Sequence, residues 1–159
     1  MTNFKYLFGS IFTILILSSC GYKVLDKSRL SDLSISSIET TGNKKINFLI
    51  KNNIRNNLSD KFAQNIVRLS IDSSSRRNIK EKNIKNEITK YQINISTKIQ
   101  VNFINKNVIK TFNLSQNGDY NVSNEQSKTI SNRNNLERYL VDKITNQFFN
   151  KLILITNDL

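Results

Sequence analysis

Cys20 carries the most distinctive chemistry in this chain, because it is the only cysteine and the chain has no histidine. The thiolate form of cysteine is a nucleophile. Serine, threonine and lysine are the other conceivable nucleophiles, yet no base and orienting partner accompany them in a recognisable arrangement. A glycine-rich phosphate loop and a Cys/His cluster with metal spacing are also missing from the sequence. We therefore expect no enzyme, no cofactor and no metal site, and read four glutamates as solvated charges: Glu81, Glu87, Glu125 and Glu137.

The segment before Cys20 has the order of a bacterial secretory signal. Lys5 lies in a short polar start, an uncharged apolar run extends from Leu7 to Leu17, and two serines precede the cysteine. The alternative is an uncleaved anchor helix with an incidental cysteine, but the apolar run is shorter than the roughly 20 residues that span a bilayer. We predict a cleaved signal peptide over residues 1–19.

The stretch Leu17-Ser18-Ser19-Cys20 resembles the lipobox of bacterial lipoproteins. The resemblance implies that a diacylglyceryl group alkylates the Cys20 thiol, that the chain is cut before Cys20, and that the new amine is acylated, for example with palmitate. Two or three acyl chains suffice for stable anchoring. Gly21 follows in place of the Asp that retains enteric lipoproteins in the inner membrane. The expected location is thus the periplasmic side of the outer membrane.

The chain that remains after cleavage has the size of one ordinary domain. The full sequence of 159 residues carries 24 Lys plus Arg and 12 Asp plus Glu, and the signal removes one lysine. Such a surplus favours anionic partners, and export argues against nucleic acid. The richness in Lys, Asn and Ile is also what an AT-rich genome produces, so we weigh the positions of charges above their sum. We predict a lipidated N-terminus and tether over 20–32 and a single domain over 33–159.

The first half of that domain is predicted to be strand, helix, strand. Residues 33–40 form a strand that ends in a turn at Gly42. An amphipathic helix from about Lys44 to Gln64 follows, and a second strand covers residues 67–71. The apolar side of the helix recurs every four residues: Ile46, Ile50, Ile54, Leu58 and Phe62.

Residues 72–85 have the composition of an exposed loop or a marginal helical turn, with three serines followed by several basic residues. Arg76 and Arg77 could hold phosphates, since guanidinium donors match phosphate oxygens in pairs. A solvated loop without a ligand is an equally good interpretation.

The second half begins with a long hairpin. Apolar residues alternate with polar ones from Tyr91 to Phe103, a period of two that indicates a strand with one buried face. Its partner covers residues 108–115 and ends at Asn117-Gly118-Asp119. Ser123 and Gln126 resemble a capping box. A helix over most of 125–154 follows, with a second four-residue row: Leu136, Leu140, Ile144, Phe148 and Leu152.

The predicted fold class is α+β, in the order β-α-β-β-β-α. About four strands form a mixed or antiparallel sheet, and both helices pack on its one apolar face as a two-layer sandwich. The other face stays polar, with Lys90, Gln92, Asn94, Lys98 and Gln100.

The combined pattern resembles the LptE family, the lipopolysaccharide-assembly lipoproteins of Gram-negative outer membranes. The resemblance lies in Cys20-Gly21-Tyr22, in the strand-helix-strand opening and long hairpin, and in Tyr120-Asn121 before a helix with Leu136 and Leu140. It implies a non-catalytic plug inside the β-barrel LptD, which helps the barrel assemble and binds lipopolysaccharide during its delivery to the cell surface. Charge and placement suggest four lipopolysaccharide-binding candidates: Arg76, Arg77, Lys98 and Lys110.

Two other functions remain open at this point. One is an envelope lipoprotein with a generic periplasmic binding module, such as one that binds peptidoglycan. The other is a lipid-anchored hydrolase, which would need an acid/base constellation that the sequence does not offer.

We expect Cys20→Ala to abolish incorporation of labelled palmitate, because the thioether to diacylglycerol can no longer form. The variant should still reach its barrel, since the predicted fold lies wholly downstream of Cys20. Metabolic labelling followed by affinity purification measures both properties, and Ser19→Ala, which keeps a small side chain at the cut, is the control. Palmitate on the Cys20→Ala variant would contradict the assignment.

Overall fold

This computed structural model describes residues 33–58 and 65–156. The predicted signal peptide, the lipid attachment at Cys20 and the tether over 20–32 lie outside the described residues. The domain limits predicted from the sequence therefore stay predictions.

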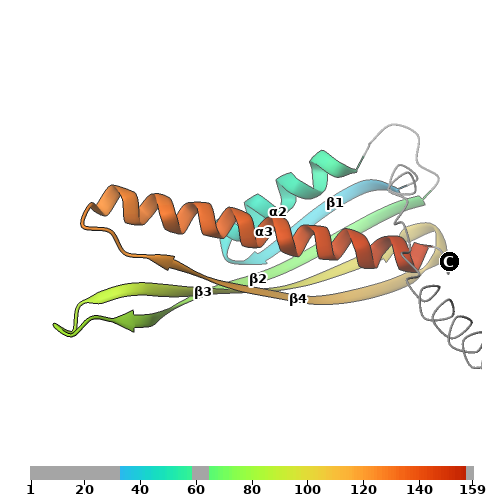
Figure 1. The fold of residues 1–159 in the computed structure, drawn as a ribbon. Helices are drawn as coiled ribbons and strands as arrows, with labels where there is room; N and C mark the ends of the chain where they lie inside the picture. The colour runs from blue at the N-terminus through green and yellow to red at the C-terminus, as the bar shows by residue number, and fades with distance from the viewer. Residues whose placement is uncertain (1–32, 59–64, 157–159) are drawn as a thin grey trace, which may run out of the picture.

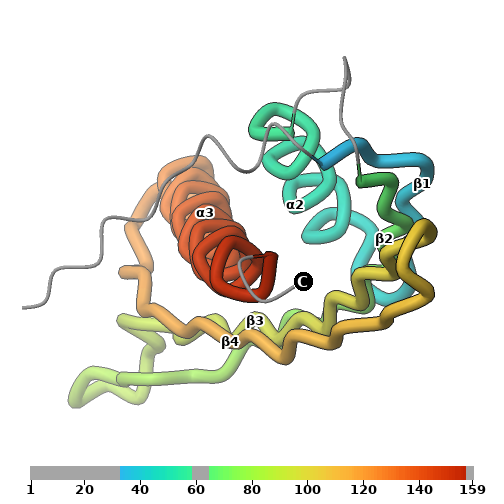
Figure 2. Tube along the Cα trace, turned by 90° about the vertical axis from the view of Figure 1, so that its right-hand side faces the viewer, coloured from blue at the N-terminus to red at the C-terminus, as the bar shows by residue number. Residues whose placement is uncertain are grey.

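The described residues form one four-stranded sheet and two main helices (Figure 1). The sheet order is β1-β2-β3-β4, with β1 parallel to β2 and the other neighbours antiparallel. Figure 2 shows α2 and α3 side by side on one face of the sheet. The predicted α+β two-layer sandwich is confirmed. Its elements are β1 (Leu33–Gly42), α2 (Lys44–Asn57), β2 (Asn65–Lys82), β3 (Ile88–Phe103), the short 3-10 helix η2 (Ile104–Lys106), β4 (Val108–Asn121) and α3 (Gln126–Thr156).

The turn between β1 and α2 depends on Gly42, which has a φ of 86°. A Cβ at Gly42 would collide with the backbone oxygen of Ser73, so only glycine fits there. Asn43 follows, donates its N–H to that same oxygen at 2.8 Å, and accepts the N–H of Ile46 at 3.1 Å as the helix N-cap. The predicted turn is confirmed, with a local reason for each residue.

Helix α2 is shorter than predicted. It ends at Asn57, and Leu58 is already extended while its N–H still bonds to the Ile54 oxygen at 3.1 Å. The expected apolar row is nevertheless buried as far as it is described, and Phe62 lies outside the described residues. Its buried members are Ile46, Ile50, Ile54 and Leu58.

The predicted loop after Ile71 is wrong, because β2 continues as a strand to Lys82. Its pairing with β3 runs on from Ser73 opposite Thr97 to Arg77 opposite Ile93. The serines and arginines predicted a loop through their polarity, but the antiparallel ladder satisfies their backbone groups whatever their side chains are. The reversal lies at residues 83–87, where the N–H of Asn83 donates to the Glu87 oxygen at 2.9 Å.

Strand β4 likewise passes through Asn117-Gly118-Asp119, which was predicted to end it, and reaches Asn121. A Cβ on Gly118 would lie 2.8 Å from the Cδ1 atom of Leu136. The glycine therefore lets α3 approach the sheet closely, and it is a packing position instead of a turn.

Helix α3 begins at Gln126, so Ser123 lies too far ahead of the first turn to cap it as predicted. Thr129 replaces Gln126 as the partner: its hydroxyl accepts the Ser123 N–H at 2.8 Å and donates to the Ser123 oxygen at 3.2 Å. The predicted apolar row is confirmed, with Leu136 partly buried and the other four members buried. Phe148 is fully buried and meets Phe112 edge-on at 5.5 Å between ring centroids.

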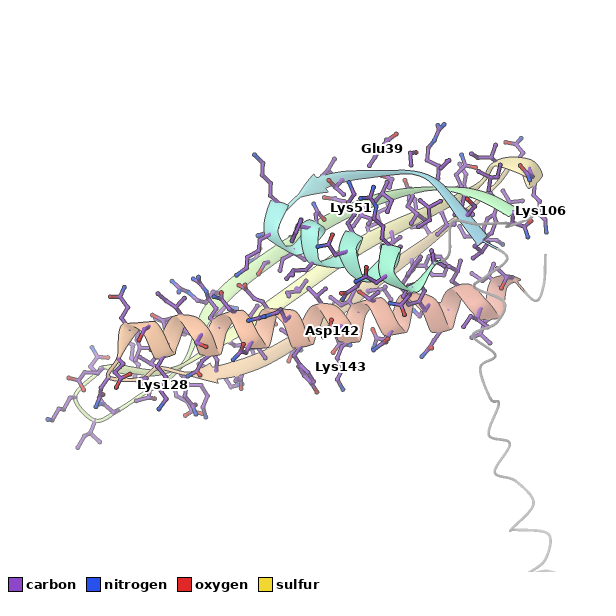
Figure 3. All side chains as sticks on the ribbon, turned by 90° about the horizontal axis from the view of Figure 1, so that it is seen from above. Glu39, Lys51, Lys106, Lys128, Asp142 and Lys143 are labelled. Carbon is purple, nitrogen blue, oxygen red and sulfur yellow. The ribbon has the colours of Figure 1, made fainter. Side chains whose placement is uncertain are left out.

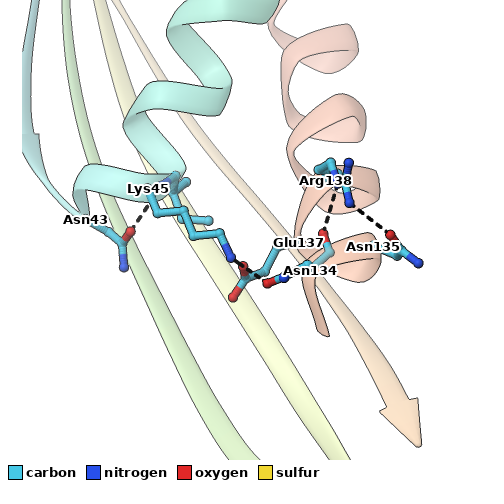
Figure 4. Close-up of polar contacts among 7 residues, drawn as sticks. Asn43, Lys45, Asn134, Asn135, Glu137 and Arg138 are labelled. Atoms are coloured by element: carbon cyan, nitrogen blue, oxygen red, sulfur yellow. Dashed lines mark hydrogen bonds and ion pairs between the residues drawn. The ribbon is translucent and has the colours of Figure 1, made fainter. Parts of the chain in front are cut away.

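Glu137 is not a solvated charge, which corrects the prediction. It is 9% exposed and forms an ion pair with Lys45, so that it links α3 to α2 (Figure 4). The same ammonium group donates to Asn134 at 2.8 Å. Asn53 adds a second link between the helices through a 2.7 Å hydrogen bond to Asp142. Polar contacts therefore link the two helices above the apolar core.

We expect Phe148→Ala to lower the free energy of unfolding by about 3 to 5 kcal/mol, because the lost ring leaves a cavity. Tyr139→Ala on the same helix removes a ring that is 55% exposed and is the matched control. Urea denaturation followed by circular dichroism measures both. Similar losses in the two variants would contradict the assigned core.

Candidate functional site

The sheet face turned away from the helices is polar and carries charges of both signs. The residues predicted for this face lie there, and none of them is buried. Its basic side chains, Arg68, Arg76, Lys90 and Lys98, are interspersed with the acidic ones of Glu39, Asp72, Glu81 and Asp119. Glu81 and Lys90 form an ion pair at 2.7 Å. The face suits a hydrophilic partner and has no strong preference for anions.

A shallow hollow of about 320 Å³ lies midway along this polar face. Small serine side chains leave the space, and Lys98 borders it opposite Asp72. With a carboxylate beside the ammonium group, the hollow is a poor site for a phosphate.

The structure does not bring the four predicted lipopolysaccharide-binding residues together. Strand alternation puts Arg76 and Lys98 on the polar face and Arg77 and Lys110 on the helix side. Arg76 and Lys98 are separated by four residue steps along the sheet, which is about 13 Å. Arg77 and Lys110 are opposite Ile93 and Val101 of β3, which are about 26 Å apart at the usual rise of a strand. The four side chains therefore do not line one common binding site.

Arg77 lies in a groove of about 470 Å³ at the end of the domain where β2 and β3 approach the hairpin turn. The floor comes from the strands and the wall from the first turns of α3 and the connection before it. Lining the groove are Arg77, Tyr91, Val122, Ser123, Asn124, Gln126, Thr129, Ile130 and Arg133.

Two tyrosines hold the Arg77 side chain in place. Its guanidinium carbon is 4.6 Å from the centre of the Tyr91 ring, and that ring stacks on Tyr120 at 5.6 Å. The pKa of Arg77 is raised above its ordinary value, first by a side-chain hydrogen bond with Tyr120 and then by the charge interaction with that phenol. Both contacts favour the cationic guanidinium over its neutral form.

Arg133 supplies a second guanidinium to the groove from α3, and its buried Nε atom has no hydrogen-bond partner. The first turn of α3, which begins at Gln126, lies in the same wall and adds the partial positive charge of a helix start. Tyr91, Val122 and Ile130 add apolar surface between these groups. The arrangement is suited to an amphipathic anion, such as a phosphorylated lipid.

The hairpin turn beside the groove adds an exposed apolar residue among cations. Ile84 is fully exposed at the tip, with Lys80, Lys82 and Lys85 nearby in the sequence and also exposed. Asn83 shapes the turn, since its side-chain oxygen accepts the N–H groups of Lys85 and Glu87 at 2.9 Å each. Figure 3 shows this end, near Lys128, opposite to the end that carries Lys106.

Sequence reasoning found Arg77 but missed Arg133 and the role of Tyr91 and Tyr120. Tyr91 was correctly assigned to the helix-side face, yet its contact with Arg77 exists only because β2 is longer than predicted. Arg133 lies in a polar stretch of helix, and nothing in its neighbours distinguishes it from a solvated residue.

Other chemistry is limited within the described part of the chain. No group of three or more histidine, cysteine, aspartate or glutamate side chains could hold a metal ion there. None of the helices in residues 33–58 and 65–156 is both long and apolar enough to cross a membrane.

No protein-family model matches the chain, and no curated protein matches its sequence. Solved structures with the same fold include three bacterial lipoproteins. A candidate lipoprotein from Caulobacter crescentus has a TM-score of 0.58 at 11% identity, over 83% of this chain and 95% of that one. A minor lipoprotein from Acinetobacter baumannii has a TM-score of 0.50 at 12% identity, over 76% and 94%. Lipoprotein B from Nitrosomonas europaea, of uncharacterised function, has a TM-score of 0.50 at 9% identity, over 80% and 88%.

We expect Arg77→Ala to lower the free energy of unfolding by about 0.5 to 1 kcal/mol, because it removes an exposed cation–π contact. Arg76→Ala, one residue away on the polar face, should stay within about 0.5 kcal/mol of the parent. A double-mutant cycle of Arg77→Ala with Tyr91→Leu, measured by urea denaturation, isolates the pair. A coupling energy of zero would contradict the contact.

Proposed function

We propose that this chain is an outer-membrane lipoprotein of the LptE type. In this role it plugs an LptD-type β-barrel, helps the barrel assemble and binds lipopolysaccharide during delivery to the cell surface. The observation that carries the proposal is the groove in which Arg77 and Arg133 border apolar side chains. The proposed role is non-catalytic.

The groove matches the chemistry of the lipid end of lipopolysaccharide, which combines phosphates with acyl chains. A guanidinium group donates two parallel hydrogen bonds to a phosphate. Tyr91 already fixes Arg77, so less conformational entropy is lost when a ligand binds. Ile130 and Val122 offer the apolar contact that a free inorganic phosphate would not use.

The polar sheet face supports the plug role. Amide and hydroxyl side chains, with charges of both signs, can bond to a water-lined lumen without burying an unpaired charge. An apolar face would instead favour a dry protein interface. The two helices cover the only extensively apolar side of the sheet, so the hydrophobic core is complete without the barrel.

The lipobox-like stretch before Cys20 and the fold shared with bacterial lipoproteins support an envelope lipoprotein. Gly21, in place of Asp, supports the outer membrane as the location.

We expect a large β-barrel and lipopolysaccharide to co-purify with the tagged full-length chain after detergent extraction of envelopes. Mass spectrometry identifies the barrel, and chemical analysis of the core sugars measures the glycolipid. Recovery of a free monomer without barrel would contradict the plug role, and retention on purified cell-wall sacculi would favour a peptidoglycan-binding module.

The matched variants in the same purification separate the two halves of the proposal. Arg77→Ala with Arg133→Ala should reduce the glycolipid recovered per barrel by about tenfold or more, as expected for two lost charge-assisted contacts. Arg76→Ala with Lys98→Ala removes the same charge from the polar face and should leave that ratio unchanged. Equal losses in both pairs would mean that net charge, and not the groove, determines binding.

A further inference from the structure

An apolar patch interrupts the polar sheet face at the end of the domain farthest from the groove. It consists of Ile66, Ile104 and Ile109, which are 39%, 44% and 63% exposed. Between this end and Lys90, the described residues of β2, β3 and β4 on that face are polar. Such clustering of exposed apolar side chains marks a contact surface.

Strand register makes the three isoleucines neighbours. Val67 is opposite Phe103 in the last pair of the β2–β3 ladder, so Ile66 in β2 and Ile104, the first residue of η2, are the residues next to that pair. Ile109 is opposite Asn102, which places it diagonally across the β3–β4 hairpin from Ile104. The three isoleucines therefore form one continuous apolar patch.

Cations lie beside the patch. Lys106 is exposed in the adjacent 3-10 helix η2, and Arg68 follows Ile66 on the same face of β2. Among the described residues, β2 has no acid before Asp72 and β4 has none before Asp119. Apolar side chains with cations beside them fit a surface that is apolar inside and anionic outside.

The length of the chain keeps this end within reach of the proposed lipid anchor. β1 starts here, with Leu33 opposite Asn65 and Ser34 opposite Ile66. From Cys20 to Leu33 the chain takes 13 residue steps, so even fully extended it reaches about 45 Å. A bilayer that holds acyl chains on Cys20 is thus present at an effective concentration of about millimolar beside the patch.

We propose that the patch formed by Ile66, Ile104 and Ile109 rests on the phospholipid bilayer in which Cys20 is anchored. This inference rests on the lipid anchor of the proposed function and adds a second contact to it. The tether then does not leave the domain free to rotate. The isoleucines enter the headgroup region, and Lys106 contacts anionic headgroups.

The chain has no tryptophan, so Ile109→Trp gives it a single indole reporter. The lipidated full-length variant is placed in vesicles of phosphatidylethanolamine and phosphatidylglycerol, with and without bromine on the acyl chains. We expect a blue-shifted emission that the brominated lipid quenches. Ile84→Trp, at the fully exposed opposite tip, is the matched control and should show neither change. Adding Ile66→Asn and Ile104→Asn to the reporter should reduce the quenching.

Flotation of the vesicles distinguishes failure of the bilayer contact from failure of the lipid anchor. If the chain floats with the vesicles and the Ile109→Trp indole is not quenched, the bilayer contact is wrong while the anchor stands. If the chain does not float, the lipid anchor itself fails, and the proposed location fails with it. A blue shift without quenching by brominated lipid would mean that protein, such as a second copy, covers the patch, and this also overturns the inference.

Discussion

The structure depends on the long antiparallel pairing of β2 with β3, whose register is regular as far as Ile79 opposite Tyr91 and shifts around Glu81. It runs from Val67 opposite Phe103 to Lys82 opposite Ile88, and both remaining strands are added to it, one on each side. This ladder extends past the region that the helices bury, so its far part is held by backbone hydrogen bonds more than by apolar contact. The groove exists because the ladder continues there: it carries Arg77 to the point where Tyr91 and the start of α3 meet.

The long helices and strands could be predicted from the regular spacing of their apolar residues, but the residues at which they end could not. The alternation in β3 and the four-residue rows in α2 and α3 report burial directly, so the layers and the core followed from them. Residues 72–82 and 117–121 have side chains typical of loops, and only their pairing with an already formed strand makes them extended. Glu137 was misassigned for a related reason, because its partner Lys45 lies on another helix and is 92 residues away in the sequence. For the candidate site, one arginine could be predicted, and the second depended on where α3 crosses the strands.

The domain separates its chemistry by position. Apolar packing lies between the sheet and the helices, polar side chains cover the open face, the arginine groove lies at one end, and the isoleucine patch lies at the other. β3 alone has 16 residues, so the two ends are about 50 Å apart. Few contacts can connect the two ends directly. A substitution at one end should change the structure at the other end only through the sheet.

The arginine pair 76–77 shows how strongly the surface depends on strand phase. The two residues are adjacent in the sequence, yet one belongs to the face proposed for the barrel and the other to the groove proposed for the glycolipid. Insertion or deletion of one residue between Ser73 and Arg76 would exchange these assignments without changing the composition, unless a bulge absorbed the shift. The number of residues before Arg76 in this strand therefore matters for function as much as the types of those residues. A related chain with the same function should keep a guanidinium at position 77, together with the strand phase that carries it into the groove.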